Sequence, residues 1–311
     1  MSNPLVSIAC VTYNHEPFIR QCLEGFIMQQ TDFDFEVVIH DDASTDGTKD
    51  VILEYCLKYP NLFRPIFQEQ NRYIEGKGIF ARFVFPECRG KYIAMCEGDD
   101  YWTDPLKLQK QVSLLENNLN YSCSFHICNV VDSFGNVLIE NYPQCYKFED
   151  SLISLENLIL GSAIPQTLSV VFRATVIPML PLSCRITDII LFYYLLKMGN
   201  AICVAENMGV YRNHSAGEWS GMSYTQKIIS TIKCRLDIYE ADGTDLSALF
   251  VMLMFNTYPR SLYVKELSLT IRIFQIIYKY LGLWKTLLLI FNKAIFNRFP
   301  SGETLRNLIM Y

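Results

Sequence analysis

The most informative segment of the sequence is Lys91-Tyr92-Ile93-Ala94-Met95-Cys96-Glu97-Gly98-Asp99-Asp100-Tyr101-Trp102-Thr103-Asp104-Pro105. Its apolar run, 92–96, has the length and composition of a buried strand. Three carboxylates follow within four residues, interrupted only by Gly98. Pro105 then opens a segment with helical spacing, 106–116. Acids at the C-terminal end of such a strand lie where α/β sheets bind their ligands.

The acidic cluster 97–100 has two interpretations. Carboxylates this close repel one another unless a cation neutralises them, and hard oxygen ligands suit Mg²⁺ or Mn²⁺. A solvated acidic turn that caps the following helix gives the same pattern. The stretch alone therefore predicts either a metal site or a helix cap.

Length and composition indicate a folded protein that does not act mainly on nucleic acid. The 311 residues suffice for one large or two modest domains. Half of the residues are hydrophobic and 19% are charged, which argues against disorder. The net charge of −5 disfavours a nucleic-acid backbone as partner. Eleven cysteines without regular spacing are typical of reduced thiols in a cytosolic protein.

Targeting and membrane-spanning patterns are missing from this sequence. The start has no basic segment followed by an apolar core, as a secretory signal would have. No uninterrupted apolar run reaches the ~18–20 residues that span a bilayer. We therefore expect a cytoplasmic protein.

Strand and helix patterns alternate through the first third of the chain. Apolar runs at 5–11, 35–39 and 63–68 are separated by segments with helical spacing. This alternation predicts a mostly parallel sheet that is flanked by helices. No glycine-rich phosphate loop follows any of these strands, so a bound nucleotide would need other contacts.

The character changes near Gly221, beyond which apolar helical segments continue almost to the end. We therefore predict a catalytic part, 1–221, and a helical extension, 222–311. Residues 269–299 mix aromatic, apolar and basic side chains. This mixture suits a helix on the inner face of an anionic membrane, and it equally suits a packed cap or homodimer interface.

Three loops, read together, resemble the family 2 glycosyltransferases, which have the GT-A fold. They are 6–14, 37–48 and 91–105, and the likeness covers roughly the first two thirds of the chain. It implies that the sheet binds a nucleotide-diphosphate sugar and that a divalent metal, Mn²⁺ or Mg²⁺, sits on the diphosphate. It also implies sugar transfer from a UDP- or dTDP-sugar to a hydroxyl of a glycan or lipid-linked saccharide, as in surface-polysaccharide assembly.

The resemblance assigns the donor site residue by residue. Asp42 matches the acid that accepts a hydrogen bond from the base, although turn formation explains it too. For Asp46, turn chemistry is the preferred interpretation. A surface ion pair is the alternative for Arg82. The residues implied to bind the nucleotide sugar are Thr12, Tyr13, Asn14, Asp41, Asp42, Ser44, Arg82, Glu97 and Asp99.

The metal ligands implied by the resemblance are Asp100 and His214. Glu97 stands where the family commonly has Asp, and its longer side chain makes it accessory. His214 matches a residue that approaches the diphosphate or the metal, and a satisfied surface histidine explains it equally well.

Asp188 matches the segment in which the family carries its general base. A base here would deprotonate the acceptor on the face opposite the leaving group and so give inversion. An Asp after Thr187 at a helix start is also common simply because acidic residues stabilise the first turn of a helix. The competing functions are a sugar nucleotidyltransferase and a catalytically inactive module that binds nucleotide sugars or glycans.

Overall fold

The structure is a computed structural model. The chain forms two compact units. Residues 3–75, 78–144, 151–159, 164–181, 185, 187–215, 217, 219–254 and 266–279 are described. The first unit comprises Met1–Leu155 and Ala163–Ser220, and the second comprises Glu156–Ser162 and Gly221–Tyr311. The predicted site residues all belong to the first unit.

The first unit is an α/β sheet unit. Its strands are β1 (Val6–Thr12), β2 (Phe35–Asp41), β3 (Phe63–Phe67), β4 (Tyr92–Glu97), β5 (Tyr101–Trp102), β6 (Tyr121–Val131), β7 (Val137–Tyr142), β8 (Leu152–Ile153), β9 (Val171–Arg173) and β10 (Asn200–Arg212). Its helices are α1 (Glu16–Ile27), α2 (Thr48–Lys58), α3 (Lys107–Asn117) and α5 (Asp188–Met198).

The strands form one mixed sheet in the order β3-β2-β1-β4-β9-β6-β10-β5, with β7 on β6 and β8 on β10. The pairs β1–β2, β1–β4, β2–β3 and β6–β10 are parallel. The short strand β9 is antiparallel to both β4 and β6. Thr12 pairs with Asp41, and Val11 pairs with Glu97, so the predicted loops leave the sheet at one edge.

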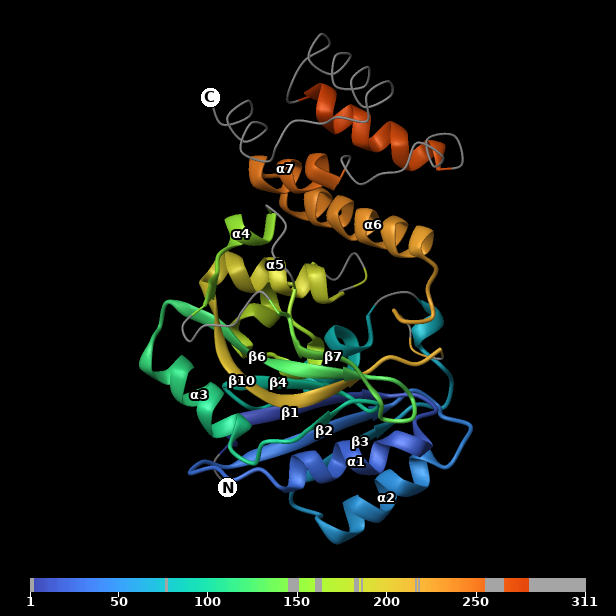
Figure 1. Cartoon of the computed structure of the whole chain (residues 1–311), viewed down its shortest axis with the longest axis vertical. Coiled ribbons are helices and arrows are strands. Elements are labelled where there is room, and N and C mark those ends of the chain that lie inside the picture. Colours follow the sequence, from blue (N-terminus) through green and yellow to red (C-terminus); the bar gives the residue numbers. More distant parts are fainter. Residues whose placement is uncertain are drawn as a thin grey trace. The chain divides into compact units, whose positions relative to one another are not determined.

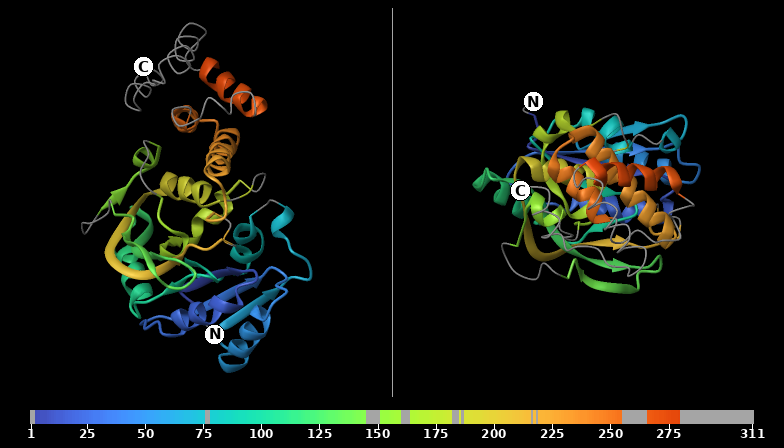
Figure 2. Two further views of the ribbon diagram at one scale, coloured as in Figure 1. Left: turned by 45° about the vertical axis from the view of Figure 1, so that its right-hand side comes forward. Right: turned by 90° about the horizontal axis from the view of Figure 1, so that it is seen from above.

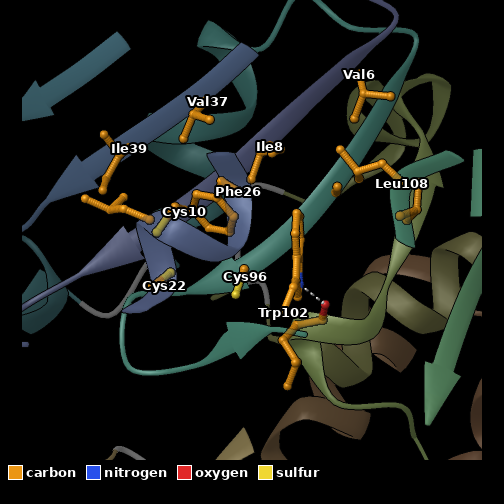
Figure 3. Close-up of a cluster of buried hydrophobic side chains, with 14 of the residues drawn as sticks. Val6, Ile8, Cys10, Cys22, Phe26, Val37, Ile39, Cys96, Trp102 and Leu108 are labelled. Atoms are coloured by element: carbon orange, nitrogen blue, oxygen red, sulfur yellow. Dashed lines mark hydrogen bonds between the residues drawn. The ribbon is translucent and has the colours of Figure 1, made fainter. Parts of the chain in front are cut away.

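Helices cover both faces of the sheet, with α1 and α2 on one face and α5 on the other (Figure 1). Phe26 of α1 and Leu108 of α3 join Ile8 and Trp102 in the main core cluster (Figure 3). The Trp102 indole N–H donates to the Leu168 carbonyl at 2.8 Å, so its polar atom is satisfied inside the core. This packing holds β5, the strand that follows the acidic motif, in place.

At three places the structure differs from what the local sequence pattern predicts. The spacing over 79–88 predicts a helix, but these residues include a π-helical turn, Phe80–Val84, and a 3₁₀ turn, Phe85–Glu87. The apolar run 168–172 predicts a strand, which begins only at Val171, after a 3₁₀ turn. The patterns at 201–205 and 208–211 predict two short strands, but both belong to one long strand, β10, which curves along the sheet (Figure 2). Shifts of its register beside β6 explain the apparent break.

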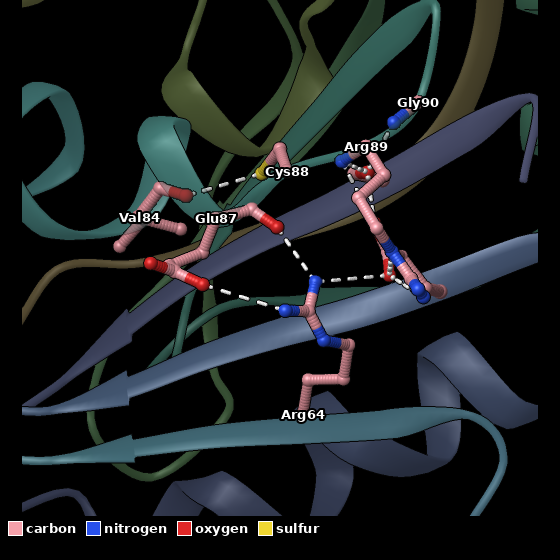
Figure 4. A network of polar contacts seen from close by, with 8 residues as sticks. Arg64, Val84, Glu87, Cys88, Arg89 and Gly90 are labelled. Carbon is pink, nitrogen blue, oxygen red and sulfur yellow. Dashed lines mark hydrogen bonds and ion pairs between the residues drawn. The ribbon is translucent and has the colours of Figure 1, made fainter. Parts of the chain in front are cut away.

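A polar network lies near the amino ends of β1 and β2, away from the predicted loops. The buried Glu36 carboxylate accepts hydrogen bonds from the Ser7 hydroxyl at 2.7 Å and from Arg89 Nε at 2.9 Å. Arg64 approaches the same carboxylate at 3.3 Å and also reaches Glu87 (Figure 4). Burial raises the pKa of Glu36, but the hydrogen bonds outweigh it and leave that pKa below its ordinary value. This network ties the strand ends together.

Most of the second unit that is described is helical. Its helices are most of α4 (Leu155–Ile159), α6 (Tyr224–Asp242), α7 (Asp245–Met254) and a helix over 267–279. Ser223 and Gln226 form a capping box at the start of α6, and Gly243, with φ of 66°, ends that helix. Within the described ranges, no helix combines the length and apolar character of a membrane span. Of the stretch 269–299, residues 280–299 lie outside the described residues.

Candidate active site

The loops that follow β1 and β2 are tied together at the carboxyl edge of the sheet. Asn14 and Ala43, one in each loop, both have left-handed backbones, with φ of 54° and 62°. The Asn14 side-chain oxygen accepts from the Thr45 N–H at 2.8 Å, and the Asn14 N–H donates to the Ser44 hydroxyl at 2.9 Å. These bonds hold the two predicted nucleotide loops side by side.

A second set of bonds joins the start of α1 to the β2–α2 loop. The Asp46 carboxylate accepts from the Thr48 N–H at 3.0 Å and from the Glu16 N–H at 3.1 Å. Glu16 accepts from the Gly47 N–H at 2.8 Å, and the His15 N–H donates to the Thr48 hydroxyl at 2.8 Å. Asp46 thus forms the turn contacts that its sequence context favours.

The two acids at the end of β2 have different partners. Asp41 accepts hydrogen bonds from the Ser44 hydroxyl and, at 3.2 Å, from the Ser44 N–H. Burial raises the pKa of Asp41, although these hydrogen bonds act in the opposite direction. Asp42 accepts from the N–H groups of Arg72 at 2.8 Å and Tyr73 at 2.9 Å. Asp42 therefore anchors the loop after β3, and its contact with a base stays a prediction.

Thr12 ends β1 against the glycine of the acidic motif. Its side chain is buried, and its hydroxyl has no hydrogen-bond partner among the described residues. A Cβ atom on Gly98 would lie 2.6 Å from that hydroxyl and 3.0 Å from Ile19, so only glycine fits here. The next residue, Tyr13, is 41% exposed, so its ring is available to a ligand.

Asp99 is the carboxylate that two histidines approach. His214 Nε2 lies 2.9 Å and His15 Nε2 lies 3.7 Å from the same oxygen, Oδ2. The side chains are 15% exposed for Asp99, 17% for His15 and 7% for His214. Burial raises the pKa of Asp99, but the His214 hydrogen bond and the charges of both histidines lower it below its ordinary value. Burial lowers the pKa of His15, and Asp99 opposes this only in part.

Asp100 is buried, with 1% of its surface exposed. Its Oδ1 accepts from the Arg212 N–H at 2.8 Å, and its Oδ2 has no hydrogen-bond partner among the described residues. Burial, followed by the charge of Asp99, raises the pKa of Asp100 well above its ordinary value. Because an unpaired buried carboxylate oxygen is unfavourable, a cation bound nearby would offset that penalty.

Two groups of described side chains have the composition and spacing of a divalent-cation site. Glu97, Asp99 and Asp100 form the first group, which offers only oxygen. The second group consists of His15, Asp99 and His214. Within each group, the ligand atoms all lie within 4.8 Å of one another. The residues present therefore fit a bound cation, and Asp99 is common to both groups.

Arg212, at the end of β10, holds a buried guanidinium beside two rings. Its central carbon lies 4.9 Å from the Phe18 ring centroid and 4.8 Å from the Tyr101 ring centroid. The guanidinium also donates to Gln21, and its Nε has no partner among the described residues. A guanidinium keeps its charge in such surroundings and is well suited to pair with phosphate.

Asp188 is the first residue of α5, and its side chain is exposed. The Thr167 hydroxyl donates to Asp188 Oδ2 at 3.0 Å. The N-cap residue Thr187 makes no side-chain capping bond. Thr167 and Asp188 both lie in the first unit, together with the acidic motif.

Tyr211 links Asp188 to the acidic motif electrostatically. Burial is the main cause that raises the pKa of Tyr211, and nearby negative charges add to it. Those charges belong to Glu97, Asp100, Asp99 and Asp188. The charge of Asp188 thus acts on the same hydroxyl as the charges of the acidic motif.

Arg82 takes part in an ion pair near the loop after β3. It pairs with Glu75, which also pairs with Arg72 at 2.9 Å. Its guanidinium carbon lies 4.9 Å from the Phe83 ring centroid. This is the surface ion pair that the sequence leaves open as an alternative, and a contact with the nucleotide stays a prediction.

His15 and Arg212 are absent from the residues predicted for this site, although both adjoin predicted ones. His15 directly follows Asn14, and it is one of only four histidines in the chain. Arg212 lies two residues before His214. Their position beside predicted loop residues is the signal that could have identified them.

Comparisons with known proteins find relatives in sequence. The model of glycosyl transferase family 2 matches residues 7–167. An uncharacterised protein of Mycobacterium tuberculosis strain H37Rv is 39% identical over 227 residues, which make up 71% of this chain and 62% of that protein. The chain thus spans less than two thirds of the length of these curated mycobacterial relatives.

Solved structures share the fold. Residues 1–349 of S. aureus TarS in complex with UDP-GlcNAc match with a TM-score of 0.64 and 18% identity, covering 98% of this chain and 90% of that one. The mannosyltransferase PcManGT from Pyrobaculum calidifontis, in complex with GDP-Man and Mn²⁺, matches with a TM-score of 0.59 and 15% identity, covering 100% and 85%. The likeness confirms the predicted GT-A fold.

Proposed function

Because the chain belongs to glycosyl transferase family 2, we propose that it transfers a sugar from a nucleotide-diphosphate donor to a hydroxyl acceptor, with inversion at the anomeric carbon. The donor is a UDP- or dTDP-sugar, and the acceptor is a glycan or a lipid-linked saccharide. Two structures of the same fold contain UDP-GlcNAc and GDP-Man, which supports a nucleotide-sugar donor.

The observation that carries this proposal is the carboxylate cluster where β4 ends, in which ligand atoms of Glu97, Asp99 and Asp100 lie within 4.8 Å of one another. Asp188 lies in the same unit and accepts a hydrogen bond from the Thr167 hydroxyl at 3.0 Å. The proposal assigns roles to Asp99 and Asp188. A group-transfer site needs one acid to hold the leaving side and another to accept a proton from the attacking side. These two carboxylates have those positions in the proposal.

The donor lies along the tied loops at the carboxyl edge of β1 and β2. The exposed ring of Tyr13 covers one face of the base. Asp42 uses its remaining acceptor capacity for an N–H of the base. Asp41 and Ser44 hold the loop through their mutual hydrogen bond. The buried Arg212 offers its charge to the diphosphate.

Asp188 accepts the proton of the acceptor hydroxyl as the new bond to the anomeric carbon forms. The bond from that carbon to the diphosphate oxygen breaks, and the electron pair leaves with the diphosphate. Attack from the face opposite the leaving group gives inversion. The hydrogen bond from Thr167 orients the Asp188 carboxylate for this step.

The divalent cation implied by the family, Mn²⁺ or Mg²⁺, would be held at Asp99, with the predicted ligands Asp100 and His214 beside it. When bound, it supplies positive charge that stabilises the departing diphosphate. The geometry that supports this placement is the close approach of donor atoms within 4.8 Å in each of the two groups.

A panel of UDP-, dTDP- and GDP-sugars tests the proposal, with and without Mn²⁺. A donor present at 100 times its dissociation constant should stabilise the fold by about 2.7 kcal/mol in thermal unfolding. Release of nucleoside diphosphate and the anomeric configuration of the product then report transfer. Asp99→Ala, which removes the carboxylate common to both groups, should keep the fold and lose cation-dependent donor binding. Absence of stabilisation by every nucleotide sugar would overturn the proposal.

A further inference from the structure

The helix over 267–279, red-orange in Figure 1, has one face packed within the second unit. Its buried side chains recur every one to four residues and so lie on one side of the helix. They are Leu269, Thr270, Ile273, Ile276 and Ile277. Contacts with α6 hold the helix in place, since Arg272 donates to Glu240 and Lys279 Nζ lies 3.1 Å from the Tyr239 hydroxyl.

The opposite face of this helix exposes large apolar side chains. Leu267, Ile271 and Tyr278 are 57%, 46% and 55% exposed. Their spacing by four and then seven residues places them on one stripe along the helix. An apolar stripe that is rimmed by polar residues on an exposed helix marks a binding surface.

Basic side chains lie along one edge of the apolar stripe. With about 3.6 residues per turn, Gln275, Arg272 and Lys279 fall between the stripe and the buried face. The same three side chains line a groove of about 210 Å³ against α6, from which Tyr239 and Glu240 also line it. Glu240 pairs with Arg272, so the groove combines two cations with one acid.

The sequence around the helix is basic, although the whole chain carries a net charge of −5. Between Glu266 and Glu303 it contains five basic residues and no acidic one. A positive segment beside an apolar stripe is complementary to a surface that is both anionic and apolar, as a membrane with anionic lipids is. A second copy of this face is a poorer partner, because pairing would bring like charges together.

We propose that the exposed face of the helix over 267–279 docks on a lipid surface with anionic headgroups. Leu267, Ile271 and Tyr278 enter the boundary between headgroups and acyl chains. The tyrosine suits this boundary because its ring is apolar and its hydroxyl is polar. Arg272 and Lys279 contact the lipid phosphates. This docking goes beyond the proposed function, since it requires neither donor nor acceptor.

Binding of the full chain to vesicles provides the test. Flotation compares vesicles of equal parts phosphatidylglycerol and phosphatidylcholine with vesicles of phosphatidylcholine alone, without any nucleotide sugar. We expect binding to the anionic vesicles to be at least about 10-fold stronger. Raising the salt concentration should weaken this binding, because salt screens the attraction between the basic side chains and the headgroups.

Substitutions at exposed positions separate the two parts of the surface. Leu267→Gln combined with Ile271→Gln should weaken binding to anionic vesicles at least about 10-fold, because it removes the apolar contacts. Lys279→Gln should weaken it about 5-fold and reduce its salt dependence. Leu57→Gln is the matched control, since Leu57 is 84% exposed on α2 of the first unit and should leave binding unchanged. Thermal unfolding checks that each variant is folded.

Equal binding to both kinds of vesicle, or no vesicle binding by the unaltered protein, would overturn the inference. So would a dimer that forms without lipid in analytical ultracentrifugation and is dissociated by Ile271→Gln. These measurements contain no donor, so their failure would leave the proposed sugar transfer standing. If the protein binds anionic vesicles but no nucleotide sugar stabilises it, the docking surface stands and the proposed function fails.

Discussion

Lys107 lies with its ammonium nitrogen 3.7 Å from the centroid of the Trp102 ring, inside the protein. The lysine side chain is buried, and its nitrogen has no hydrogen-bond partner among the described residues. A desolvated cation gains about 2 kcal/mol from an indole face, but removing an ammonium from water costs more. Burial accordingly lowers the pKa of Lys107 to about 7.

We expect Lys107→Met to stabilise the protein at about pH 6 and to flatten its pH dependence. Between the folded pKa of about 7 and an unfolded pKa of about 10.4, the unfolded chain holds a proton that the folded chain has released. The free energy of unfolding therefore rises with pH there, by at most about 1.4 kcal/mol per pH unit. Chemical denaturation at several pH values measures this rise, which the Met variant should lack. Lys91→Met, at an exposed lysine paired with Glu116, is the control; equal slopes in wild type and Lys107→Met would contradict the prediction.

Glu36→Gln should lower the free energy of unfolding by about 1–3 kcal/mol at neutral pH, because it weakens the hydrogen bonds from Ser7 and Arg89. Since the folded pKa of Glu36 is lowered, this stabilisation is present above the unfolded value of about 4.3 and is lost as pH falls through the folded value. Denaturation of both proteins at neutral and acidic pH checks it. The control Glu87→Gln, at a half-exposed side chain, should change the free energy of unfolding little. If Glu36→Gln destabilised the protein equally at neutral pH and in strong acid, the explanation by the Glu36 charge would be wrong.

Ala43→Gly should be neutral or stabilising, by up to about 1 kcal/mol, because the left-handed backbone at φ of 62° disfavours a Cβ atom. Ala43→Val should destabilise, since a β-branched side chain is poorly tolerated there. Thermal unfolding of the two variants gives the comparison. Donor affinity should likewise be higher for the Gly variant than for the Val variant, because Ala43 lies in the loop after β2 that is bonded to Asn14. If the Val variant were more stable than the Gly variant, the backbone at residue 43 would not be strained.

Asp188→Asn should lower turnover by about 10²–10⁴-fold and leave donor affinity nearly unchanged, because the amide cannot accept the proton. Steady-state kinetics and donor titrations separate the two effects. Thr167→Val keeps the carboxylate and removes only its hydrogen bond, so a smaller loss of turnover is expected. Collapse of donor affinity in Asp188→Asn would assign this residue to binding.

The sequence alone predicts those parts of the fold and site that depend on local patterns. The apolar run 92–96 identifies β4, and the carboxylates after it lie at the sheet edge as expected. Asp188 begins a helix, as Thr187 and the following apolar spacing indicate. The fold of the first unit was accessible for the same reason, since alternating strands and helices carry strong local signals.

The rest depends on contacts between distant segments. Nothing local indicates that His15 faces Asp99, because their approach is set by the parallel pairing of β1 with β4. The continuity of β10 likewise depends on its pairing with β6. The register shifts in that pairing interrupt the alternation of apolar and polar residues, so the sequence pattern suggests two strands. The hydrogen bonds of Asp42 go to loop amides whose position no spacing rule specifies.

The interlocking of Asn14 with Ser44 and Thr45 has a consequence for how tightly a ligand can be held. Folding has already spent the conformational entropy of these two segments, so an arriving nucleotide meets a pre-organised surface. Affinity there should depend on direct complementarity far more than on any induced rearrangement.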